Sequence, residues 1–306
     1  MQNNPFQLGN DTAYQAWREQ KLDDYPTTID QLRVDLSLDL NNQVQIEWLE
    51  TICRKTNFVI YRFNDRQSVD KALIKSLGQQ LGLLHLDGNL CADGDSISSL
   101  QVRDEGRHSA YIPYTNRRLS WHTDGYYNLP DQQIRAILMH CAQDAAEGGE
   151  NMLLDHEIAY IQLRDRNPDY IRVLMQPDAM TIPPNVEQGV EIRGEQTGPV
   201  FSLQPETGNL HMRYTARTRN IEWADNPVTQ EAVACITELL TPNNPYVFRY
   251  RLHPGEGIIC NNILHCRTGF TDDPDAGRQR LLYRARYFDR VRHTDLDKVL
   301  KHVVSE

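Results

Sequence analysis

The chain of 306 residues lacks any long apolar stretch, and no run approaches the roughly 18 residues that suggest a membrane helix. Its first 15 residues lack the basic start and the apolar run of a signal peptide. It also lacks low-complexity segments, internal repeats and any linker that would split it. We therefore expect one globular domain over residues 1–306, located in the cytoplasm, with no membrane partner.

Cysteine is scarce, and its spacing shows no pattern. The six cysteines form no C-x-x-C pair and no zinc-like spacing, which predicts reduced core residues in a reducing compartment. Basic residues are fewer than acidic ones: the chain has 32 Lys and Arg and 42 Asp and Glu, which gives a formal net charge of −10. Such a charge repels phosphate backbones, so we expect a small-molecule ligand and no nucleic acid. Whether the chain forms a homo-oligomer stays open.

Two helices and one strand are predicted in the first third of the chain. Apolar residues recur every three or four positions in 43–56 and in 68–84, a spacing typical of amphipathic helices. The β-rich run FVIYRF, residues 58–63, lies between them and predicts a strand. We expect this part, about residues 30–95, to support the rest of the fold.

Short β-like runs separated by Gly, Pro, Asn and Asp dominate the rest of the chain. We predict strands within residues 98–104, 134–142, 151–155, 179–182, 189–193, 209–215, 246–252, 257–261 and 278–288. Helical inserts fit at 155–175 and at 228–240. The pattern predicts a mainly β fold with flanking helices, in which a jelly-roll pair of sheets occupies about residues 98–290.

Three His-x-Asp triplets occur, with their histidines at positions 85, 122 and 293. Ten histidines and 42 acidic residues give about one or two His-x-acid triplets by chance, so context must separate them. His85 ends a predicted helix and His293 lies in a charged tail, and we interpret both as structural. His122 and Asp124 instead lie among aromatic residues in SWHTDGYYN, which is typical of a partly buried site.

A metal site of this kind requires a third ligand from elsewhere in the fold. Ligands two residues apart project to the same side of an extended strand, so His122 and Asp124 can chelate one ion. Two imidazoles and one carboxylate on one face of an octahedron are the ligand set of non-haem Fe(II) oxygenases. The best candidate for the third ligand is His265, which follows a Pro-Gly-Glu-Gly turn at 254–257 and precedes an arginine-rich strand.

The order of these motifs resembles a known family. H-x-D is followed by Gly148-Gly149-Glu150, then by P-G-E-G, by L-H-x-R-x-x-F and by R-x-x-x-R. This order is similar to that of the taurine dioxygenase and dichlorophenoxyacetate dioxygenase family, over roughly residues 98–290. The resemblance implies a double-stranded β-helix of the clavaminate synthase-like kind. It also implies an enzyme that uses Fe(II), 2-oxoglutarate and O2 to hydroxylate a C–H bond of a small molecule, with release of succinate and CO2.

The resemblance also implies roles for particular residues. His122, Asp124 and His265 match the iron ligands, and Arg280 matches the arginine that holds the distal carboxylate of 2-oxoglutarate.

Asn151 stands where the family usually has a threonine that contacts the same carboxylate, and an amide can still donate there. Arg284 matches a second arginine that lies near the substrate or the co-substrate in members acting on anions. The arginines, tyrosines and one asparagine before the H-x-D motif, with a second group of arginines and a tyrosine after residue 210, add to the hint of an anionic or zwitterionic substrate. They are Arg103, Arg107, Tyr111, Tyr114, Asn116, Arg117, Arg118, Arg213, Tyr214 and Arg217.

The strand RQRLLYRARYF (278–288) has an apolar face at its odd positions and a cationic face at its even positions. Side chains alternate between the two faces of a strand, so an apolar face in the core would ordinarily place such arginines in solvent. We expect instead that the helices near 43–56 and 68–84 cover the apolar face, while Arg280 and Arg284 point into the ligand-filled barrel mouth. Arg278 and Arg286 are then expected at the exposed ends of the strand.

Two other classes of function remain open at this stage. A zinc-dependent hydrolase could use the same three ligands with a water molecule, although it would not need Arg280. A non-catalytic jelly-roll protein that binds a small molecule is the second alternative. The sequence does not identify the substrate or the outcome of the reaction, because the residues that select substrates lie on loops that the pattern does not fix.

Overall fold

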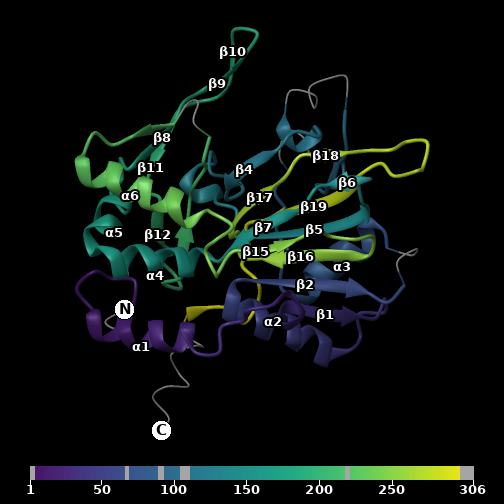
Figure 1. Ribbon diagram of the computed structural model, residues 1–306, viewed down its shortest axis with the longest axis horizontal. Coiled ribbons are helices and arrows are strands. Elements are labelled where there is room, and N and C mark those ends of the chain that lie inside the picture. Colours follow the sequence, from purple (N-terminus) through teal and green to yellow (C-terminus); the bar gives the residue numbers. More distant parts are fainter. Residues whose placement is uncertain (1–3, 66–68, 89–92, 104–110, 218–220, 297–306) are drawn as a thin grey trace.

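Two β-sheets form the centre of the computed structural model, which describes residues 4–65, 69–88, 93–103, 111–217 and 221–296 (Figure 1). The larger sheet has the strand order β1 (Arg33–Leu36), β2 (Phe58–Phe63), β16 (Glu256–Cys260), β5 (Ala136–Gln143), β19 (Leu281–Tyr287) and β3 (Ser98–Leu100). The smaller sheet has the order β15 (Phe248–Tyr250), β7 (Asn151–Leu154), β17 (Leu264–Arg267) and β4 (Leu119–His122). Only β1 and β2 pair in parallel within these two sheets.

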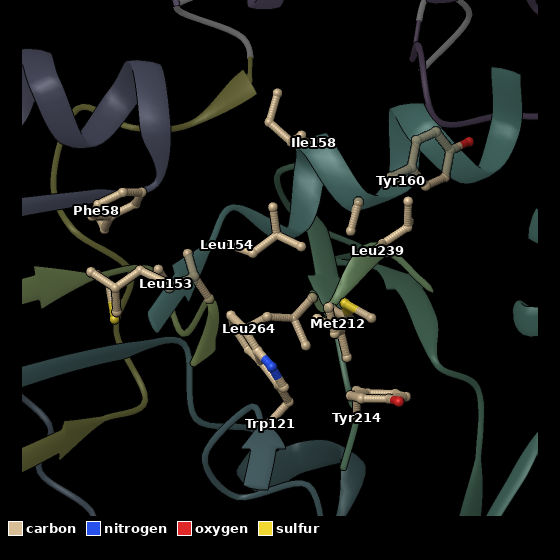
Figure 2. Packing of buried hydrophobic residues seen from close by; sticks show 14 of the residues in the cluster. Phe58, Trp121, Leu153, Leu154, Ile158, Tyr160, Met212, Tyr214, Leu239 and Leu264 are labelled. Atoms are coloured by element: carbon tan, nitrogen blue, oxygen red, sulfur yellow. The ribbon is translucent and has the colours of Figure 1, made fainter. Parts of the chain in front are cut away.

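The inner faces of the two sheets share one hydrophobic cluster. Ile60 and Ile137 reach it from the larger sheet, and Leu153 and Leu264 reach it from the smaller one. Trp121 of β4 belongs to the same cluster, and Figure 2 shows it among Leu153, Leu264 and their neighbours. The predicted mainly β jelly roll with flanking helices is therefore confirmed.

Two amphipathic helices cover the outer face of the larger sheet (Figure 1). They are α2 (Gln43–Thr56) and α3 (Lys71–Gln80), and α2 has the bounds that its apolar spacing predicts. Ala285 and Tyr287 of β19 are buried in the cluster beneath them, as predicted for the apolar face of that strand. The α3 helix is shorter than the predicted 68–84, and residue 68 lies outside the described residues.

The expectation that Arg286 lies at an exposed strand end is wrong. Its side chain is 3% exposed, because Asp87 from a segment before β3 supplies a carboxylate beside it. Arg278 is exposed, as expected, and precedes the first residue of β19.

The remaining helices gather at the other end of the molecule. The predicted insert at 155–175 is two helices, α4 (His156–Arg166) and α5 (Pro168–Leu174), because Asn167 caps the second one and Pro168 begins it. The insert at 228–240 is α6 (Pro227–Leu239). Helix α1 (Asp11–Leu22) was not predicted. Its buried face includes the charged Lys21, so no apolar periodicity marks it.

Short strands and turns complete the described chain. The hairpin of β9 (Asn185–Glu187) and β10 (Val190–Arg193) projects from the body of the molecule (Figure 1). The other short elements are the strands β6 (Glu147–Gly148), β8 (Met180–Ile182), β11 (Gln196–Gly198), β12 (Phe201–Leu203), β13 (Leu210–Met212), β14 (Glu222–Trp223) and β18 (Phe270–Thr271), and the 3-10 turns Ile29–Leu32, Ile112–Tyr114 and Pro130–Gln132. Among the described helices, none is long and apolar enough to cross a membrane.

Candidate active site

Three buried side chains that could hold a metal ion meet between β4 and β17. His122 ends β4, Asp124 follows it by two residues, and His265 lies opposite His122 on the antiparallel strand β17. One ligand atom from each lies within 4.8 Å of the others. The structure thus brings His265 to a pair of side chains that lies about 140 positions earlier in the sequence.

Backbone carbonyls orient both imidazole rings toward the carboxylate. The Nδ1 of His122 lies 2.8 Å from the Ser120 oxygen, and the Nδ1 of His265 lies 2.9 Å from the Ile263 oxygen. A carbonyl oxygen only accepts, so Nδ1 of each ring carries a proton and Nε2 is the atom that can present a lone pair to a metal ion. These Nε2 atoms lie 3.3 and 4.0 Å from Oδ1 of Asp124. Lone pairs that converge in this way fit a metal cation, and two imidazoles with one carboxylate suit iron.

Asn262, which we did not predict, connects the two halves of this cluster. Its Oδ1 accepts from the backbone N–H of Asp124 at 2.7 Å, and its Nδ2 donates to the carbonyls of Asp124 and Ile134 at 2.9 and 2.7 Å. It lies between β16 and β17 with a φ of +49°, a conformation that asparagine tolerates better than most residues. In sequence it looked like an ordinary turn residue.

The turn after Asp124 requires glycine. Gly125 has a φ of +66°, and a Cβ there would lie 2.5 Å from Cγ1 of Ile134. Any other residue would therefore push on the segment that carries the carboxylate.

Burial and local charges set the protonation states of Asp124 and His265. Burial alone would raise the pKa of Asp124, but the nearby positive charges of Arg284 and Arg286 outweigh burial and hold this pKa well below its ordinary value. Burial, followed by the neighbouring His122, lowers the pKa of His265 to about 4. At neutral pH the cluster therefore presents an anionic carboxylate and a neutral imidazole at position 265.

Arg284 of β19 lies beside the metal-ligand cluster. Its Nη1 is 3.3 Å from Oδ2 of Asp124, but the contact lacks hydrogen-bond geometry. Among the described residues, Oδ2 of Asp124 and Nε of Arg284 have no hydrogen-bond partner. Arg284 is 8% exposed and borders a cavity of about 560 Å³ that also reaches His122 and Asp124. A buried guanidinium in this position can bind an anionic group.

Arg280 and Asn151 border a second, much smaller cavity of about 10 Å³. Burial lowers the pKa of Arg280 to about 10, and its Nη1 has no hydrogen-bond partner among the described residues. Its guanidinium lies 5.1 Å from the centre of the Phe270 ring. A buried cation with an unpaired donor beside an amide has the chemistry that binds a carboxylate.

Asp87, Arg286 and Tyr127 were missed by sequence reasoning, and all three line the larger cavity. A carboxylate oxygen of Asp87 pairs with Nη2 of Arg286, and Nη1 of Arg286 donates to the Tyr127 hydroxyl at 3.0 Å. The period-two register does put Arg286 on the same face as Arg284, but we expected Arg286 at an exposed strand end. Nothing local in the sequence connects Asp87 to that face.

The other arginines and tyrosines that the sequence suggests as contacts of an anionic substrate do not all lie at the larger cavity. Tyr111, Tyr114 and Arg217 line the larger cavity. Arg213 is buried and donates to the backbone carbonyls of Tyr126, Met180, Gly198 and Gln196, so its role is structural. Arg107 lies outside the described residues.

Comparison with known proteins establishes the family. Residues 21–286 match the model of the family described as "Taurine catabolism dioxygenase TauD, TfdA family". The chain belongs to this family. It is thus a dioxygenase that uses Fe(II), 2-oxoglutarate and O2 on a small-molecule substrate, as the motif order predicted. Membership favours this reaction over a zinc hydrolase and over a non-catalytic binding protein.

The chain is similar to a curated relative and to two solved structures. A uridine-5'-phosphate dioxygenase of Amycolatopsis sp is 31% identical over 205 residues, which cover 64% of this chain and 69% of that protein. The structure of an asparagine oxygenase with Fe(II), 2S,3S-3-hydroxyasparagine and succinate has a TM-score of 0.58 at 14% identity, over 84% of this chain and 93% of that one. The structure of the non-haem iron oxygenase OrfP with Fe, succinate and (3S)-hydroxy-L-Arg has a TM-score of 0.59 at 15% identity, over 81% of each chain. The structural likenesses confirm the fold.

Proposed function

We propose that the enzyme hydroxylates a carbon next to an anionic group of a small molecule, and that it binds iron through His122, Asp124 and His265. Arg280 and Asn151 hold the distal carboxylate of 2-oxoglutarate, and Arg284 faces the anionic group of the substrate. The observation that carries this proposal is the convergence of three ligand atoms within 4.8 Å beside a buried arginine.

Residues of the chain orient the proposed metal ligands and keep water away from the reacting atoms. When bound, Fe(II) would activate O2 with 2-oxoglutarate as the two-electron reductant, so that one oxygen atom of O2 enters the C–H bond of the substrate and the other enters succinate as CO2 is released. The backbone contacts of both imidazoles fix the ring orientation, and Asn262 fixes the carboxylate turn. Burial of the three ligands keeps water away from the reacting atoms.

The cavity lining supports an anionic substrate without an ammonium group. Its carboxylates among the described residues are Asp87 and Asp124, and both are committed, the first to Arg286 and the second to the ligand cluster. An amino-acid substrate needs a free acid group for its ammonium, and this lining offers none. Amino acids of the kind named with the two structural relatives are therefore disfavoured.

A nucleoside 5'-monophosphate is the first substrate to test. It carries a phosphate for Arg284, and its base suits a wall that contains Tyr111, Tyr114 and Tyr126. A volume of about 560 Å³ is within the usual range for small-molecule sites. The name of the Amycolatopsis relative supports the same choice.

Succinate release tests the proposal directly. The enzyme with Fe(II), 2-oxoglutarate and O2 is incubated with uridine 5'-monophosphate, taurine or asparagine, and Asp124→Ala is the blank. We expect uridine 5'-monophosphate to stimulate succinate release and asparagine to have no effect. Stimulation by asparagine alone would contradict the assignment of an anion without an ammonium group. A cytoplasmic location, a single domain and a possible homo-oligomer stay predictions.

A further inference from the structure

We propose that Asp87 and Arg286 hold the Tyr127 hydroxyl as a second hydrogen-bond donor to the anionic group of the substrate, which makes Tyr127 a specificity-determining residue. This inference rests on the proposed function, because it describes one subsite of the same cavity. None of the three residues belongs to the family motifs quoted above.

Arg286 does not act as a free cation in the cavity. Its side chain is 3% exposed, and one side of its guanidinium pairs with the Asp87 carboxylate. The other side donates to the Tyr127 hydroxyl oxygen at 3.0 Å. Since Asp87 compensates its charge, Arg286 acts on a ligand through the tyrosine that it holds.

The Tyr127 hydroxyl keeps its own proton for a ligand. Its oxygen already accepts from Arg286, so the O–H must donate in another direction. No acceptor among the described residues takes this proton, and Tyr127 lines the cavity together with Asp124 and Arg284. A hydroxyl whose oxygen is bound by a cation is a stronger donor than a free one.

The ring of Tyr127 is held from two further sides. The Tyr126 ring packs against it edge-on, with centroids 5.1 Å apart, and the Arg193 guanidinium lies 5.6 Å from its centre. Arg193 in turn donates to the carbonyls of Gly194 and Pro183 at the base of the β9–β10 hairpin. The hydroxyl is therefore preorganised, which lowers the entropy that binding must overcome.

A purely structural role would not require the Asp87–Arg286 pair. The backbone N–H of Asp87 already donates to the Arg286 carbonyl at 2.8 Å, and Leu86 bridges to Tyr287. These contacts fix the segment at the edge of β19 without either side chain. Burying a charged pair in a cavity wall costs free energy. The orientation of the Tyr127 hydroxyl by Arg286 is a function that explains the presence of the pair.

Arg284 and Tyr127 together form a subsite with one charged and one neutral donor. The carboxylate beside Arg284 is that of Asp124, a proposed metal ligand. When Asp124 binds the metal, the Arg284 guanidinium is available to bind the substrate. An oxyanion with at least two acceptor oxygens, such as a phosphate monoester, can use both donors.

Anaerobic binding of uridine 5'-monophosphate and of uridine to the enzyme with Fe(II) and 2-oxoglutarate tests the inference. Tyr127→Phe removes only the hydroxyl, and we expect roughly 10-fold weaker binding of the monophosphate with uridine unchanged. The matched control is Tyr283→Phe, on the opposite face of β19, which should match the wild type. The visible absorption band of bound Fe(II) and 2-oxoglutarate should be the same in all three proteins.

A double-mutant cycle tests how Arg286 acts. The paired substitution Asp87→Asn with Arg286→Gln removes both charges together and leaves no buried charge unpaired. We expect it to weaken binding of the monophosphate, and to weaken it no further when Tyr127→Phe is already present.

Additive effects, an equal loss of uridine binding, or a Tyr127→Phe variant within twofold of the wild type would each overturn the inference. So would a wild-type enzyme that forms the absorption band and does not bind the monophosphate. A wild-type enzyme that forms no band would contradict the proposed function itself, and the subsite with it.

Discussion

His122 and His265 face each other across the antiparallel pair β4 and β17, with imidazole centroids 4.3 Å apart. Each ring donates through Nδ1 to a carbonyl two residues before it on its own segment. The geometry of the ligand cluster therefore depends on strand pairing and on the backbone. Residues that fix the backbone here should matter for metal binding as much as the three proposed ligands.

Asn262→Ala tests this dependence on the backbone. The substitution removes one acceptor and two donated hydrogen bonds around Asp124, so we expect about 2–3 kcal/mol lower stability and roughly 10-fold to 100-fold weaker Fe(II) binding. Urea unfolding and Fe(II) titration measure the two effects.

Asn244→Ala is the matched control for Asn262→Ala. Asn244 is also a buried amide, and it donates to the Leu239 carbonyl and to Gln162, outside the ligand cluster. Its substitution should lower stability and leave Fe(II) affinity unchanged. Equal Fe(II) affinities of the two variants would contradict the role given to Asn262.

Arg280→Lys should weaken 2-oxoglutarate binding while preserving the positive charge. A lysine cannot present the planar pair of donors that a carboxylate accepts, so we expect roughly a 10-fold to 100-fold rise in the apparent Kd. Anaerobic titration of the visible absorption band measures it. Arg278→Lys is the control, since Arg278 is exposed and pairs with Asp144. The assignment fails if both variants bind 2-oxoglutarate like the wild type.

His140 should make the stability of the protein depend on pH. It is buried between the rings of Tyr61 and Tyr283, and burial lowers its pKa from 6.5 to about 4. The unfolded chain therefore binds more protons between these values, so this contribution to stability is present above pH 6.5 and is lost as the pH falls toward 4.

His140→Phe should reduce the loss of unfolding free energy between pH 6.5 and pH 4 by up to about 3 kcal/mol, measured by urea unfolding across this range. The control is His253→Phe, at an exposed histidine, which should keep the wild-type profile. An unchanged profile for His140→Phe would rule out a buried neutral imidazole at this position.

Much of the fold and of the candidate site follows from local sequence. The apolar spacing of 43–56 gives the bounds of α2, because a helix that covers a sheet needs one apolar face. The three proposed ligand positions stand out through an ordered set of motifs, although spacing alone does not distinguish His122 from two other histidines.

What sequence reasoning missed depends on partners far away along the chain. Arg286 is buried because Asp87, about 200 positions earlier, compensates its charge. Helix α1 is stabilised by Lys21, whose ammonium lies 2.7 Å from Asp155 and 2.5 Å from Glu157 in the interior. A charge pair of this kind has no periodicity in sequence, so only the folded chain reveals it.

The most direct measurement is anaerobic addition of Fe(II) and 2-oxoglutarate to the wild type and to His265→Ala, followed by visible absorption and metal analysis. We predict one iron per chain and a weak charge-transfer band in the wild type, and neither in the variant. A colourless wild-type mixture, or a variant that retains both iron and the band, would contradict the account of His122, Asp124 and His265 as one iron site.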